Sequence, residues 1–261
     1  PNEFGVVNGH VESQLKLYGA LAQLLAEKAS AEKDYGRKLM ELSRGFQSQL
    51  SSVNNSKDGT TNRDSAQSGQ QTEDPEQIEL FPAARKWALY LEGEGNLHVK
   101  LSSAISSQIV EELQKAIGSL EDTRKKNLEF YHRMLTERDT VYAVKDSMKA
   151  YFDTRSKILA ATQRKLERTT SEREQKKFSK KAMKHKSKRN HAKNEYILQV
   201  AKANAIKQAT NHQFTPRLMD CMQVIDEQRV AVTKKMLLRF METQSSIYTK
   251  MVGNAQETMR V

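Results

Sequence analysis

The chain has 261 residues, of which 37% are hydrophobic and 29% charged, and its formal net charge is +11. This composition is too polar for a compact globule of that length and is typical of thin helical bundles, which have much surface and little core. No apolar run approaches the roughly 18 residues of a membrane-spanning helix. Apolar residues recur at helical spacing through most of the chain, which argues against full disorder. The single cysteine, Cys221, excludes an internal disulfide, fits a reducing compartment, and is interpreted as a small residue near a helix core.

The first predicted helix spans residues 10–51. Its apolar residues recur mostly every three or four positions, which places them on one face of a helix. Residues 52–74 follow, with Val53 and Ala66 as their only apolar residues, and predict a mobile loop.

Two longer helices are predicted over residues 75–169 and 175–254, joined by a turn where the apolar pattern weakens. Residues 119–215 contain neither Gly nor Pro, the residues that most often end helices. The last helix carries apolar heptads, one of them starting at Leu218, and such heptads indicate helices that pack along their length. Pro216 interrupts this helix and is expected to kink it.

The lengths of these helices predict how they assemble. They would span about 65, 140 and 120 Å if straight, so the first can cover only part of the other two. We therefore predict an all-α, elongated helical bundle of three long helices that is completed by dimerisation. Gly93, Gly95 and Gly118 lie inside the second helix and are expected to allow a close backbone approach or a local bend.

Positive charge is concentrated in residues 164–193, which contain thirteen Lys or Arg against three Glu. Like charges one turn apart repel each other by tenths of a kcal/mol, and few acids offset that repulsion here. A solvated helix face is the simpler interpretation, but the excess of cations favours an anion-binding surface. On a helical wheel seven cations form one stripe or flank it: the stripe residues Arg173, Lys177, Lys181, Lys184 and Lys188, and the flanking Lys176 and Lys180.

Further cations point away from the apolar stripes of the first two helices. They are Lys33, Arg37 and Arg44 in the first helix, Lys126 and Arg133 in the second, and Lys125 on the flank of that pair. Arg124, by contrast, falls on the core phase of the second helix and is a weaker candidate for anion binding.

Several kinds of chemistry have no motif in the sequence. The six histidines form no pair with the spacing of a helical zinc site, and neither a nucleotide-binding glycine loop nor a serine nucleophile elbow is present. We predict no catalytic residue, metal or cofactor in this segment.

Four motifs, in chain order, resemble those of F-BAR domains. Residues 31–46, AEKDYGRKLMELSRGF, are similar to the first long helix of that family, and residues 87–101, WALYLEGEGNLHVKL, are similar to the start of its second. The basic cluster at residues 124–126 lies where family members carry one. The third long helix is matched by residues 193–196 followed by residues 214–229, FTPRLMDCMQVIDEQR. The pattern is most similar to Toca-like and fungal actin-patch members.

The resemblance implies an antiparallel, crescent-shaped homodimer with higher-order filaments as a further form of assembly. It implies binding to anionic membranes containing phosphatidylserine or phosphoinositides, and sensing or generation of membrane curvature. It also implies a cytoplasmic protein, peripheral at the plasma membrane or at endocytic and actin structures, whose parent chain continues into C-terminal modules linking membrane to actin in endocytosis or cytokinesis. In such a dimer the cations of the first two helices would form a central patch, and those of residues 173–188 a patch near each tip. Residues 52–74 carry no bulky apolar pair, so binding is expected to be electrostatic.

Two other functions are compatible with the residues. A basic coiled coil could bind nucleic acid, because Lys-rich runs also neutralise phosphates. Phe178 is the only aromatic residue in the dense basic run, however, so base stacking is poorly supplied. The third possibility is a dimeric rod that only spaces partner modules.

Overall fold

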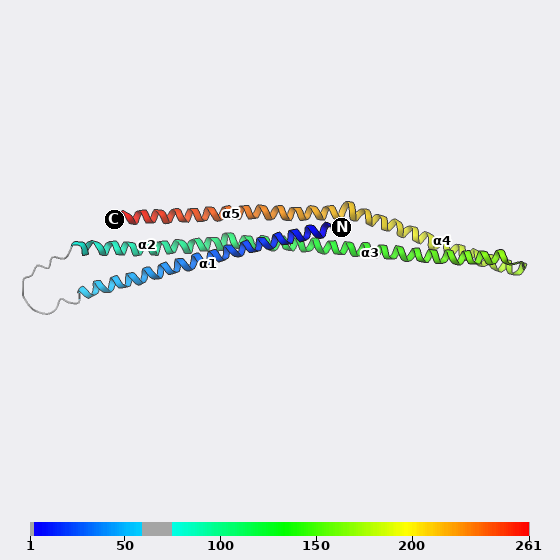
Figure 1. Ribbon diagram of the computed structural model, residues 1–261, viewed down its shortest axis with the longest axis horizontal. Coiled ribbons are helices and arrows are strands. Elements are labelled where there is room, and N and C mark those ends of the chain that lie inside the picture. Colours follow the sequence, from blue (N-terminus) through cyan, green and yellow to red (C-terminus); the bar gives the residue numbers. More distant parts are fainter. Residues whose placement is uncertain (1–2, 59–74, 261) are drawn as a thin grey trace, which may run out of the picture. The chain divides into compact units, whose positions relative to one another are not determined.

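The computed structural model describes residues 3–58 and 75–260, and all of these except residues 169–171 and 260 are helical (Figure 1). The predicted all-α fold of three long helices is confirmed. The first is α1 (Glu3–Asp58). The second is continuous through α2 (Pro75–Ile105), the short π-helix η1 (Ser106–Val110) and α3 (Glu111–Arg168). The third is continuous through α4 (Glu172–Ala209), the π-helix η2 (Thr210–Phe214) and α5 (Thr215–Met259).

The first helix is longer at both ends than its apolar pattern predicts. It begins at Glu3 because Phe4 is buried against Tyr131, with ring centroids 4.3 Å apart. It continues through Asp58, whereas the sequence predicted a loop from residue 52. In this last part the hydroxyls of Ser51 and Ser52 donate to backbone carbonyls of the preceding turn. Residues 59–74, the rest of the predicted loop, lie outside the described residues.

The turn between the second and third helices is shorter than expected and comprises residues 169–171. The backbone N–H of Gln175 donates to the Ser171 carbonyl over 2.9 Å, and its side-chain amide donates to the Thr169 carbonyl over 2.8 Å. These bonds start α4 at Glu172, three residues before the predicted start.

Pro216 does not break the third helix. The irregularity expected from it lies in η2, just before the proline, where the Thr215 N–H donates to the Thr210 carbonyl five residues back. Because proline has no N–H to donate, a wider turn at this point changes the bonding pattern without ending the helix.

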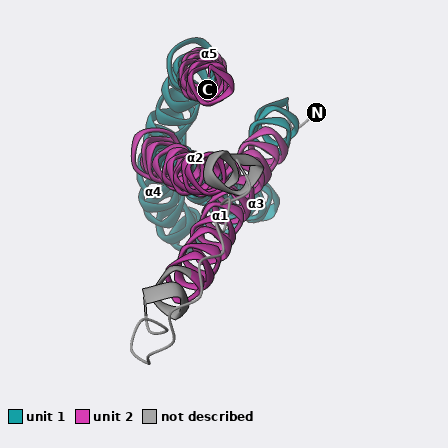
Figure 2. Cartoon of the chain, turned by 90° about the vertical axis from the view of Figure 1, so that its left-hand side faces the viewer, with its two compact units in different colours: residues 1–11, 122–225 teal, residues 12–121, 226–261 magenta. Residues whose placement is uncertain are grey.

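The chain divides into two compact units (Figure 2). Unit 1 comprises residues 1–11 and 122–225, and unit 2 comprises residues 12–121 and 226–261. The core of unit 2 is apolar and draws on three helices. Its buried residues are Tyr18, Ala22, Leu25 and Ala29 from α1, Leu101, Ile105, Ile109, Val110 and Leu113 from α2 to α3, and Met236 from α5.

Two glycines set the closest approach of α1 and α2 in unit 2. A Cβ built on Gly95 would lie 2.5 Å from the carbonyl oxygen of Gly36, and one built on Gly36 would lie 2.5 Å from the carbonyl oxygen of Gly95. Among the three glycines singled out in the sequence, Gly95 therefore serves a close approach, whereas a Cβ on Gly118 would meet nothing within 4 Å. Two turns further along α1, the buried Ser43 hydroxyl donates to the Ala88 carbonyl over 2.7 Å.

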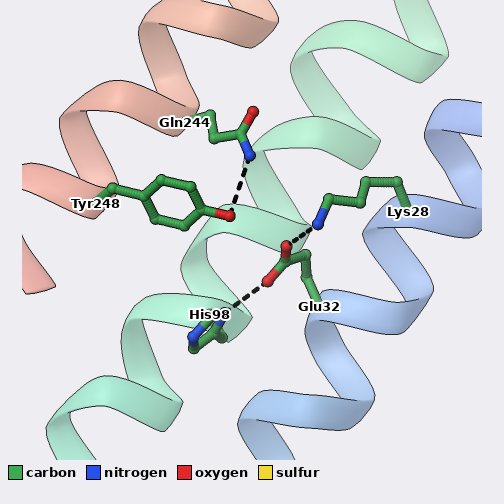
Figure 3. Close-up of polar contacts among 5 residues, drawn as sticks. All are labelled: Lys28, Glu32, His98, Gln244 and Tyr248. Carbon is green, nitrogen blue, oxygen red and sulfur yellow. Dashed lines mark hydrogen bonds and ion pairs between the residues drawn. The ribbon is translucent and has the colours of Figure 1, made fainter.

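A buried polar cluster joins the same two helices (Figure 3). The Glu32 carboxylate lies 2.5 Å from Nδ1 of His98, and it also accepts a hydrogen bond from Lys28. Burial by itself raises the pKa of Glu32, but the hydrogen bonds from Lys28 and His98 outweigh it and hold that pKa below its ordinary value. The hydrogen bond to Glu32 raises the pKa of Lys28. The carboxylate is therefore ionised and paired in the folded protein at neutral pH.

Unit 1 is a thinner assembly whose seam is partly aromatic. Phe130 of α3 contacts Phe214 edge to face at 5.9 Å, and Phe152 stacks on Tyr196 of α4 at 6.3 Å. Arg124 is buried and donates to Oδ1 of Asn8 over 2.9 Å, which agrees with its predicted core phase.

The interpretation of Cys221 needs correction. Its side chain is exposed, although it lines a shallow groove beside the buried Leu218.

Candidate anion-binding surface

All thirteen cations selected from the sequence are exposed. They fall into three sets. One set, on α1 in unit 2, is Lys33, Arg37 and Arg44. The other two, on α3 and α4 in unit 1, are Lys125, Lys126 and Arg133, and Arg173, Lys176, Lys177, Lys180, Lys181, Lys184 and Lys188.

The α4 set is the most strongly charged part of the described chain. Twelve Lys or Arg stand against three Glu between Glu172 and Ala209. None of these twelve forms an ion pair with a residue in the described ranges, whereas cations elsewhere do, such as Lys16 with Glu12 over 2.8 Å. Among the residues that the structure describes, the charge of α4 is thus uncompensated and is available to an external anion.

The seam with α3 decides which way the α4 cations point. The inward positions of α4 include His185, Arg189, Ala192 and Tyr196, which are half-buried or, for Ala192, fully buried. At about 100° per residue, Lys177 at the centre of the stripe lies roughly 60–120° from these positions, and Lys181 at its edge lies roughly 20° from the phase of Ala192. The stripe therefore runs along one side of the seam, and its charges face solvent together.

The end of α3 adds to this surface. Lys157, Arg164, Lys165 and Arg168 are exposed and belong to the same unit as α4. Three of them, Arg164, Lys165 and Arg168, lie within the basic stretch of residues 164–193 identified in the sequence. A helical wheel drawn for one helix could not show that residues of α3 adjoin the cations of α4.

The cations of the α1 set and the α3 set are less available to an external anion than those of α4. Arg44 Nε lies 3.6 Å from a carboxylate oxygen of Glu92, so its charge is partly neutralised. The guanidinium of Arg133 lies over the Phe130 ring, 5.6 Å from its centroid. Because the α1 set belongs to unit 2 and the α3 set to unit 1, the single central patch expected from them stays a prediction.

Sequence reasoning missed three basic residues that lie on the seam itself. Arg155 of α3 and His185 and Arg189 of α4 each bury a ring or guanidinium nitrogen that has no hydrogen-bond partner. The sequence did contain an indication for Arg155, because it lies between the seam positions Phe152 and Leu159. The prediction, however, considered cations on outward faces as the candidates for anion binding.

Two absences hold for the ranges described. No helix there is long and apolar enough to cross a membrane. In the same ranges, no three His, Cys, Asp or Glu side chains gather in a group that could hold a metal ion.

These features define an all-α helical-bundle module with one strongly basic, unpaired surface. The family model described as "Fes/CIP4, and EFC/F-BAR homology domain" matches residues 3–73. Protein BZZ1 of Saccharomyces cerevisiae is 22% identical over 91% of this chain, and Protein BZZ1 of Schizosaccharomyces pombe is 28% identical over 88%. These alignments cover 36% and 34% of the two relatives, so the chain spans about a third of their length.

Solved structures give the same result for the fold. The Hof1p F-BAR domain matches with a TM-score of 0.77 at 13% identity, covering 99% of this chain and 86% of that one. The Imp2 F-BAR domain matches with a TM-score of 0.70 at 14% identity, covering 98% of this chain and 77% of that one. The resemblance to F-BAR domains is confirmed, and the chain has the F-BAR fold.

Proposed function

We propose that the protein binds anionic phospholipid membranes through the basic surface of α4 and, as a homodimer, senses or generates membrane curvature. An F-BAR fold supports membrane binding and curvature sensing in general. The observation that carries the proposal is the excess of exposed cations on α4, none of them paired within the described ranges. We place this activity on the cytoplasmic side of the plasma membrane, at endocytic or actin structures, with phosphatidylserine and phosphoinositides as the lipids.

The size of the effect follows from the number of cations. Each Lys or Arg close to an anionic membrane contributes roughly 1 kcal/mol, and the contribution falls with ionic strength. Seven exposed cations on α4 are therefore sufficient for binding when two copies act together. Nucleic acid is a weaker candidate for this surface because Phe178 is half-buried, and the ammonium of Lys181 lies over its ring at 5.9 Å from the centroid.

The proposal is tested by charge reversal on the stripe. Lys177→Glu, Lys181→Glu and Lys184→Glu together should abolish cosedimentation with phosphatidylserine vesicles near physiological salt. A matched control reverses three exposed lysines of the same helix that lie outside the stripe, Lys186, Lys193 and Lys207, with an identical change in net charge. This control should weaken binding far less, because its residues do not belong to the stripe.

Neutral vesicles and duplex DNA complete the experiment. Parent protein that sediments with anionic vesicles but not with neutral ones supports an electrostatic membrane surface. If DNA competes fully at equal phosphate concentration, the nucleic-acid function is favoured instead. Equal binding by the stripe variant and the parent would show that the α4 cations are only a solvated face.

The homodimer is proposed from apolar residues left uncovered in unit 2. Leu17 and Leu24 of α1 are 65% and 62% exposed and lie two turns apart on one face. They line a groove of about 370 Å³ whose other walls include Tyr18, Leu21 and Thr233. An exposed apolar row of this kind marks a protein interface. We propose a second copy of the chain as the partner for this row, since similarity to F-BAR domains implies dimerisation.

A further inference from the structure

A groove lies between α1 and α2 in unit 2, close to the end of α1. The two antiparallel helices approach most closely at Gly36 and Gly95, and they are joined again where the Ser43 hydroxyl donates to the Ala88 carbonyl over 2.7 Å. Beyond this bond the helices separate (Figure 1, Figure 2). Side chains that face the space between them are therefore covered on one side only.

The floor of the groove is apolar. Leu50 and Phe81 are half-buried in it, and Leu89 has an exposed fraction of 54%. The register set by the Ser43–Ala88 bond places Leu50 level with Phe81, about 10 Å further along the helix axes. The groove has a volume of about 510 Å³ and falls within the roughly 300–1,000 Å³ of ligand pockets. These side chains form an unclosed end of the α1–α2 interface, which an apolar group from outside would complete.

The wall that α2 contributes is positively charged. Arg85 is exposed and Lys86 is half-buried, and among the described residues that line the groove none is acidic. Neither cation forms an ion pair within the described ranges, whereas the nearby Arg44 lies 3.6 Å from a carboxylate oxygen of Glu92. The groove thus combines an apolar floor with positive charge that the described residues do not compensate.

The walls also limit the shape of an occupant. Every residue that lines the groove belongs to the interior of α1 or α2, where backbone N–H and C=O groups are already paired within the helix. An extended peptide can therefore not add to these walls through backbone hydrogen bonds. A helix can instead lay an apolar face into a groove, with anchoring side chains one turn apart.

We infer that this groove docks an acidic, amphipathic helical segment of another protein. Apolar side chains of that segment pack between Leu50, Phe81 and Leu89, and its carboxylates pair with Arg85 and Lys86. An arginine beside a carboxylate forms paired, charge-assisted hydrogen bonds, which add direction to the contact. A second copy of this chain has a net charge of +11 and is a poorer electrostatic match. This docking is a function separate from the membrane binding proposed for α4.

Peptide selection tests the inference on the unmodified protein. The probe is a displayed library of random peptides of about 14 residues, which span about four helical turns. Enriched peptides are then synthesised with a fluorescein label, and their affinity is measured by fluorescence anisotropy. They should combine Asp or Glu with large apolar residues three or four positions apart, and their affinity should fall as ionic strength rises.

Two groove variants remove the charge and the apolar floor separately. Arg85→Glu with Lys86→Glu should weaken peptide binding by about tenfold or more, because each partner carboxylate then meets a like charge. Leu89→Ser should weaken it by about tenfold, the effect of losing one buried leucine contact. Leu89 is largely exposed in the absence of a partner, so its replacement leaves the fold intact.

Matched controls carry the same changes elsewhere. Lys177→Glu with Lys181→Glu alters the net charge by the same amount on α4, and Leu198→Ser replaces a leucine of unit 1 that is 62% exposed. Both controls should bind the peptides within about twofold of the parent, as expected for sites that do not share a partner.

Three results would overturn the inference. One is a selection that yields no peptide dependent on Arg85, Lys86 and Leu89. Another is binding that is lost in the α4 control and kept in the groove variants, which would show that acidic peptides bind the basic stripe. In the third, a groove variant becomes monomeric or loses vesicle binding while peptide affinity is unchanged, so that a second copy or lipid occupies the groove. Circular dichroism checks each variant, and because the two groove variants are independent, misfolding of one leaves the other to decide.

Discussion

Replacing Gly95 by alanine should destabilise the protein, although alanine is the better helix former. The new Cβ would lie 2.5 Å from the Gly36 carbonyl oxygen and 2.9 Å from Cγ of Met40. A carbon needs about 3.3 Å from a carbonyl oxygen, so α1 and α2 would have to separate locally by nearly 1 Å. The obstructing atom belongs to the backbone and cannot rotate away.

The expected magnitude is the difference between two opposing effects. Overpacking of a tight contact costs about 1–3 kcal/mol, and a clash with backbone belongs to the upper part of that range. Replacing Gly by Ala inside a helix stabilises the helix by about 1 kcal/mol. Separation of the helices also strains the 2.5 Å contact between Glu32 and His98, one turn away on the same two helices. We expect a net loss of about 2 kcal/mol in the free energy of unfolding, from these two magnitudes.

Urea unfolding followed by circular dichroism measures this difference. Gly118→Ala is the matched control, because no described atom lies within 4 Å of a Cβ at that position, and it should stabilise by up to about 1 kcal/mol. In the double variant Gly36→Ala, Gly95→Ala the losses should be less than additive, because a single separation of the helices relieves both clashes. If Gly95→Ala unfolds at the same urea concentration as the parent or higher, α1 and α2 do not meet through these glycines.

Two further predictions concern the pH dependence of stability and the assembly of unit 2. Because its folded pKa is lowered, ionised Glu32 contributes stability that is fully present above its unfolded pKa of about 4.3 and is lost as pH falls through the folded value. Glu32→Gln should therefore lower the free energy of unfolding at pH 7. In urea titrations the difference in this free energy between variant and parent should decrease below about pH 4. A difference that stays constant down to pH 3 would contradict a stabilising carboxylate. Leu17→Glu with Leu24→Glu should convert a dimer of the 29.8 kDa chain to monomer in sedimentation equilibrium at low micromolar concentration. A parent protein that sediments as a stable monomer would refute the proposed dimer.

Features that depend on helical periodicity could be predicted from the sequence. The spacing of apolar residues identified three helical blocks and the turn before α4, and the same spacing placed the seven α4 cations outside and Arg124 inside. Periodicity is local: 3.6 residues per turn fixes which side chains share a face, whatever lies opposite. The extent of α1 was predicted less well, because its last turns carry no apolar stripe and its first turn packs against a distant aromatic ring.

The partner of each face was decided only by the tertiary structure. Glu32 and His98 are 66 residues apart, and nothing in either helix indicates that a carboxylate will meet an imidazole there. Gly95 was recognised as unusual within its helix, but its counterpart Gly36 became apparent only when the two backbones were seen to touch. Arg155 and Arg189 look like ordinary surface cations in a basic helix, and their burial depends on the register between α3 and α4. Helical period specifies a direction around one axis, whereas register and interhelical distance arise from the joint packing of both helices, which no single segment encodes.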